Sequence, residues 1–91
     1  YGQPVLAALA DVETSMNTYV KAVERAKKLH VAAAANRKAV TLAQAQYKEG
    51  IIAQLDILTA QQLAETSDIA AAQGDAAMGQ ALAALYKAIV G

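Results

Sequence analysis

The sequence contains no cysteine, no phenylalanine and no tryptophan, and it has a single proline. Without cysteine these residues can form neither a disulfide bond nor a thiolate metal site. Without Phe and Trp, the large side chains that fill a wide globular core are scarce. No apolar run approaches the roughly 20 residues that a membrane-spanning helix needs. The absences therefore argue against a wide core and against a spanning helix.

Alanine takes the place of these larger residues and supplies 24 of the 51 apolar side chains. It is the strongest helix former, but it buries little area. The composition therefore favours long helices that touch along narrow seams. With 91 residues, the chain is long enough for one domain. It also lacks an initiator Met, so we expect it to be a piece of a longer protein.

The formal net charge is zero, but the charges are unevenly spread. Residues 1–50 carry seven basic and four acidic side chains, whereas residues 51–91 carry one basic and four acidic side chains. Antiparallel packing of the two halves would bring opposite charges together in a solvated ion-pair face. Neither the overall charge nor the aromatic content favours a nucleic-acid partner.

A heptad pattern, with alternating steps of four and three, predicts one long helix over about residues 5–48. Its first stretch runs through Val5, Leu9, Val12, Met16, Tyr19, Val23 and Ala26. We then expect a change of phase, after which the seam continues through Leu29, Ala33, Asn36, Val40, Ala43 and Tyr47. Pro4 fits the first turn of such a helix, where its missing N–H is not needed.

Gly50 follows this helix and is suited to the residue after a helix C-terminus, where positive φ is common. We expect a turn over about residues 49–53 and a second helix over about residues 54–89, with Asp56 in its first turn. Its larger apolar residues are spaced more loosely, from Leu55 to Ile89. The expected fold is all-α: a long antiparallel two-helix hairpin. Gly74 and Gly79 are interpreted as points of close helix packing, with a bend or local unwinding of the helix as the alternative.

Both helices carry small apolar residues on more than one face, which predicts neighbours on two sides, as in a wall of helices or a four-helix bundle. Chemistry-bearing residues are isolated. His30 has no second ligand four residues away, and Ser15 and Ser67 have no recognisable base partner. We therefore expect no enzyme activity, no cofactor and no metal site.

Three blocks of the sequence resemble the TolC-type outer-membrane efflux channel family, in particular its lipoprotein branch. The first block is Val5–Glu13, and the last is the Leu-Tyr-Lys-Ala stretch that begins at Leu85. The most specific block places Tyr47-x-x-Gly50 before Leu55-Asp56-Ile57-Leu58-x-Ala60-Gln61. The family writes this as Tyr-x-x-Gly, four variable residues, then Leu-Asp-Val-Leu-Asp-Ala-Gln.

The resemblance implies a helical hairpin in the periplasmic α-barrel of a homotrimeric channel in the outer membrane of a Gram-negative bacterium. It also implies that the β-barrel and a first, similar repeat lie outside these residues. The expected partners are a periplasmic adaptor protein and, through it, an inner-membrane pump. Together they would export drugs, metals or other small molecules.

The resemblance also assigns roles near the turn. Leu55, Asp56 and Thr59 would belong to the pore gate, with Thr59 standing where the family commonly has a second Asp. Tyr47, Gly50, Ile51 and Ile52 would form the tip that contacts the adaptor. An alternative is a helical-hairpin interaction module, such as the coiled coil of a periplasmic adaptor, with no channel of its own.

Overall fold

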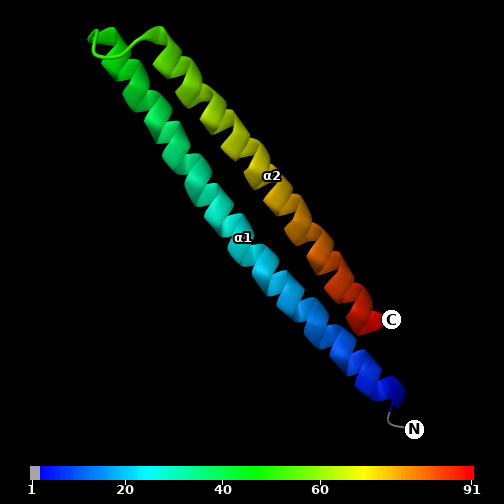
Figure 1. The fold of residues 1–91 in the computed structure, drawn as a ribbon. Coiled ribbons are helices and arrows are strands. Elements are labelled where there is room, and N and C mark those ends of the chain that lie inside the picture. The colour runs from blue at the N-terminus through cyan, green and yellow to red at the C-terminus, as the bar shows by residue number, and fades with distance from the viewer. Residues whose placement is uncertain (1–2) are drawn as a thin grey trace.

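The computed structural model describes residues 3–91 and consists of two antiparallel helices joined by one turn (Figure 1). Helix α1 spans Gln3–Lys48 and helix α2 spans Gln54–Val90. The structure thus confirms the all-α hairpin, and the helix ends lie within two residues of the expected ones. Because α1 begins at Gln3, Pro4 falls in its first turn.

The hairpin is a thin rod that measures 74 × 14 × 13 Å. Its radius of gyration is 20.5 Å, against about 12 Å for a compact globular chain of this length. Its accessible surface is 6868 Å², whereas a compact protein of this mass exposes about 5,000 Å². The hairpin therefore leaves much of its surface without an internal partner.

Helix α1 has 46 residues and α2 has 37. The first turns of α1 consequently extend past the end of α2, as Figure 1 shows at the blue end of the rod. Val5, Leu6 and Leu9, near the start of α1, are each at least 60% exposed. The seam between the two helices begins only further along α1.

On α1 the seam is one unbroken heptad series. Its buried and half-buried members are Val12, Ser15, Tyr19, Ala22, Ala26, Leu29, Ala33, Asn36, Val40 and Ala43. The expected change of phase is wrong: Ser15 takes the place given to Met16, and Met16 is 51% exposed. Tyr47 is also outside the seam, at 46% exposed. Small residues hold the seam because they let the two helix axes approach closely.

On α2 the seam is equally regular but consists mostly of small residues: Ile57, Ala60, Ala64, Ser67, Ala71, Gly74, Met78, Ala81, Leu85 and Ala88. The larger apolar residues of α2 lie mostly outside this seam. Leu55, Leu63 and Ile69 are all more than half exposed. The close approach of α1 selects Ala and Gly at the contact.

The two internal glycines of α2 differ. A Cβ added to Gly74 would lie 2.7 Å from Leu29 Cδ1 and 3.4 Å from Ala26 Cα, so Gly74 allows close packing, as expected. A Cβ added to Gly79 would meet nothing within 4 Å. Close packing within the hairpin therefore explains Gly74 and does not explain Gly79.

One polar pair interrupts the apolar seam. Asn36 Nδ2 donates a hydrogen bond to Ser67 Oγ, and both residues are half-buried. A polar pair inside a coiled-coil seam disfavours sliding, because any other register would leave the amide without a partner. This pair therefore favours the observed register of α2 along α1.

Candidate functional site

The tip of the hairpin is closed by hydrogen bonds between backbone groups. Gly50 N donates to Tyr47 O at 3.0 Å, and Ile51 N donates to Gln46 O at 2.8 Å. These two bonds form a Schellman motif, in which the residue after the helix adopts the left-handed region. Gly50 does so, with φ of 78°. The expectation for Gly50 as the helix-terminating residue is confirmed.

Apolar side chains surround this turn. Ile51 is 62% exposed and Tyr47 is 46% exposed, while Ile52 is half-buried. Tyr47 and Ile57 also line a shallow groove beside the turn with Gln44, Ala45 and Lys48. The structure therefore brings the four residues expected at the tip to one end of the rod and leaves apolar surface there.

Asp56 stabilises the start of α2. Its Oδ2 accepts a hydrogen bond from Ala53 N at 3.2 Å, while its own backbone N donates to Ala53 O at 3.0 Å. A carboxylate in the first turn is also favoured by the helix dipole. Asp56 is otherwise exposed, so one carboxylate oxygen remains available at the tip. Its position in the first turn of α2 is confirmed.

Leu55 and Thr59 lie on the same end of α2. Leu55 is 71% exposed. Thr59 is exposed as well, and its hydroxyl donates to the Leu55 carbonyl at 3.0 Å. The Thr59 hydroxyl is thus engaged with its own helix. The three residues expected at a gate lie together within the first two turns of α2.

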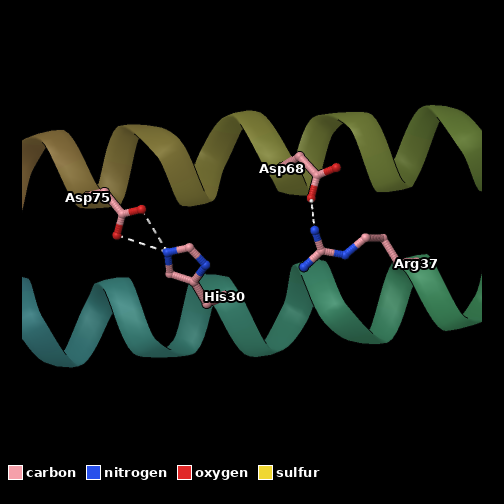
Figure 2. Close-up of polar contacts among 4 residues, drawn as sticks. All are labelled: His30, Arg37, Asp68 and Asp75. Carbon is pink, nitrogen blue, oxygen red and sulfur yellow. Dashed lines mark hydrogen bonds and ion pairs between the residues drawn. The ribbon is translucent and has the colours of Figure 1, made fainter.

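Away from the tip, two ion pairs join α1 and α2 within residues 3–91 (Figure 2). His30 Nε2 lies 2.8 Å from Asp75 Oδ2 and 2.9 Å from Oδ1, and Arg37 Nη1 lies 3.4 Å from Asp68 Oδ1. All four side chains are about half exposed, between 47% and 59%. Exposed pairs of this kind are typically worth 1 kcal/mol or less.

The uneven charge distribution predicts an ion-pair face, and the structure identifies Asp75 and Asp68 as the partners of His30 and Arg37. The signal was present in the spacing. His30 and Arg37 are seven residues apart, and so are Asp68 and Asp75, which in an antiparallel coiled coil places both pairs on one side.

Among the residues that the structure describes, no three His, Cys, Asp or Glu side chains lie close enough together to hold a metal ion. Neither helix, over the same residues, contains a stretch that is apolar enough to cross a membrane.

The protein family of this chain follows from comparison with known families. A family model described as "Outer membrane efflux protein" matches residues 1–91. The chain belongs to the outer membrane efflux protein family. No curated protein and no solved structure matches the chain. The match extends over both helices and the turn, in agreement with the resemblance of the Tyr47–Gln61 block.

Membership of the outer membrane efflux protein family makes the chain a helical segment of an outer-membrane efflux channel. It also weighs against the alternative of an adaptor coiled coil, which shares the rod shape alone. The structure of this segment is a two-helix hairpin. Family membership alone assigns no role to the individual residues at the tip.

Proposed function

We propose that this hairpin forms part of the wall of a periplasmic α-barrel in a trimeric outer-membrane channel of a Gram-negative bacterium. The observation that supports this most strongly is the exposure of large apolar side chains along both helices. Val31 on α1 is 69% exposed, and Ile69 on α2 is 60% exposed. Isolated soluble proteins rarely leave so much apolar surface uncovered, and a rod flanked by other helices would cover it.

The proposed channel exports drugs, metals or other small molecules together with a periplasmic adaptor and an inner-membrane pump. The rod shape supports this arrangement, because a rod 74 Å long can extend far into the periplasm. The turn would then lie at the periplasmic end, where the adaptor is met. No nucleic acid takes part in the proposed function.

At that end we place the pore gate, formed by Leu55, Asp56 and Thr59. Exposed side chains repeated by trimer symmetry would converge at the axis. Three copies of Leu55 would make an apolar constriction, while three carboxylates of Asp56 would repel one another if they came close. Such a gate has two packing arrangements, and contact with another protein can shift the balance between them. With Thr59 in place of a second carboxylate, attraction of cations to this aperture is weaker.

The adaptor would contact the tip residues Tyr47, Gly50, Ile51 and Ile52. The support is an apolar pair beside a turn whose backbone is fixed by the Schellman bonds. A rigid turn loses little conformational entropy on binding, so its apolar area contributes more fully to affinity.

The test is a binding measurement with the double variant Ile51→Asp/Ile52→Asp in the full-length channel. Burying two unpaired carboxylates in an apolar contact costs more than about 1.4 kcal/mol, so adaptor affinity should fall by roughly tenfold or more. The control is Gln73→Asp/Gln80→Asp, which adds the same charge at exposed positions of α2 far from the tip.

Affinity would be measured by surface-immobilised adaptor and detergent-solubilised channel, with trimer content checked by size. Loss of binding in the tip variant alone supports the proposal. Unchanged binding of the tip variant contradicts the adaptor contact, and equal loss in both variants shows that added charge, rather than the tip, is responsible.

A further inference from the structure

The hairpin has two long faces on either side of its seam. One face holds the His30–Asp75 and Arg37–Asp68 pairs, which Figure 2 shows on one side of the two helices. We call it the ion-pair face and define it by the heptad positions of those four residues. It comprises Leu9, Met16, Val23, His30, Arg37 and Gln44 on α1 and Gln61, Asp68, Asp75, Leu82 and Ile89 on α2.

Shallow grooves support this assignment. Leu9 and Ile89 line one groove near the open end of the rod. Arg37, Gln61 and Asp68 line another nearer the tip. Each groove thus collects residues of this face from both helices, as expected where two antiparallel helices present the same heptad position to one side.

The opposite face consists mostly of small residues. We call it the small face; it comprises Asp11, Thr18, Arg25, Ala32, Ala39 and Gln46 on α1 and Asp56, Leu63, Ala70, Ala77 and Ala84 on α2. Asp11 and Ala84 line one groove together with Gly91, which confirms that positions of this set meet on one side of the rod.

The difference in side-chain size has a geometric consequence when hairpins stand in a ring. On the concave side of a closed ring, side chains of neighbouring helices converge, whereas on the convex side they diverge. Because protein contacts are close-packed, the converging side needs small residues and the diverging side needs large ones. Ala70 and Ala77 suit the concave side, while Met16 and Leu82 suit the convex side.

From this asymmetry we infer that the small face lines the interior of the channel and that the ion-pair face is turned to the periplasm. The inference rests on the proposed function, since it requires the hairpin to stand in a barrel wall. The inference agrees with the gate placed in the proposed function. Asp56, which we place at the gate, lies seven residues before Leu63 and so belongs to the small face.

If the small face lines the channel, its side chains are the ones that a transported molecule contacts. Above the tip, six of the ten positions of the small face are Ala or Thr, and the other four are Asp11, Arg25, Gln46 and Leu63. Short, uncharged side chains offer few strong contacts, which suits a passage for solutes of varied chemistry. The two ion pairs lie on the other side, away from the solute, together with Met16 and Leu82.

The test is charge modification of single cysteines in the full-length channel, and the absence of native cysteine in these residues keeps the background low. Two matched pairs place one cysteine on each face at nearly the same height: Leu63→Cys with Gln61→Cys, and Ala84→Cys with Leu82→Cys. Single-channel conductance is recorded in a planar lipid bilayer before and after a small cationic methanethiosulfonate reagent. Mass spectrometry confirms that each cysteine reacts.

Modification at Leu63→Cys and Ala84→Cys should change conductance in up to three steps, one per subunit, whereas modification at Gln61→Cys and Leu82→Cys should leave it unchanged. Changes at the ion-pair face alone, or equally at both faces, would overturn the inference and leave the channel proposal standing. If all four cysteines react and conductance never changes, the hairpin is not part of the conducting wall and the proposed function itself fails.

Discussion

At the scale of single residues, Gly50 determines where the rod turns. Its φ of 78° lies in the left-handed region, and a Cβ there would meet nothing within 4 Å. Replacing Gly50 therefore lowers the stability of the hairpin through backbone strain alone, because the new side chain would clash with nothing. The position is thus a clean probe of how much the turn contributes to the hairpin.

Gly50→Ala should destabilise the hairpin by about 1 kcal/mol or slightly more, because an L-residue in the left-handed region carries that penalty. Gly50→Asn is the matched variant, since Asn tolerates this conformation better. Urea unfolding of the 91-residue chain, followed by circular dichroism at fixed protein concentration, measures both. Equal stability of the Ala variant and the wild type would show that the turn does not need positive φ.

At the scale of the helices, stability depends on a seam of small residues rather than on a broad core. The buried apolar residues of the described chain are alanines: Ala26, Ala33, Ala43, Ala64, Ala71 and Ala81. Alanine buries little area, so each contact is weak and a close approach of the backbones matters more than usual. The internal glycines test this point directly.

Gly79→Ala should stabilise the hairpin by about 1 kcal/mol, since Ala is the better helix former and the site is open. Gly74→Ala should lack this gain, because its methyl group would push against Leu29 Cδ1, 2.7 Å away. Overpacking of this kind costs about 1–3 kcal/mol, so the two variants should differ by roughly that amount in unfolding free energy. Equal stabilisation by both substitutions would contradict the close seam.

The helices could be predicted from the sequence because heptads and Gly50 mark them locally. The seam was harder to predict. The heptad pattern places Met16 in the seam where the structure has Ser15, because larger apolar residues usually mark a buried face. Here the large residues face outward, which local pattern cannot distinguish from inward burial. At the tip, the sequence placed Gly50 and Asp56 correctly, while the pairing of His30 with Asp75 depended on a register that only the structure provides.

At the scale of the whole molecule, the hairpin is a component rather than a self-contained domain. Its radius of gyration of 20.5 Å and its exposed Leu, Ile and Val residues both indicate surfaces meant for other helices. Because the two ion pairs are about half exposed, they contribute little to the free energy of unfolding. Their main use is to identify which side of the hairpin is the ion-pair face. Membership of the efflux family supplies the assembly in which these surfaces would be covered.

The central claim, that this hairpin and its tip serve an efflux channel, is tested most directly by dye export. Cells that lack the parent gene and other efflux channels would be complemented with full-length wild type, with Gly50→Pro, or with Thr66→Ala as an exposed control whose hydroxyl bonds only to the Gln62 carbonyl. Proline fixes φ near −65° and cannot adopt the observed turn. We predict that wild type and Thr66→Ala restore export while Gly50→Pro, present at equal level in the outer membrane, does not. Failure of wild type to restore export, or full export with Gly50→Pro, would contradict the account.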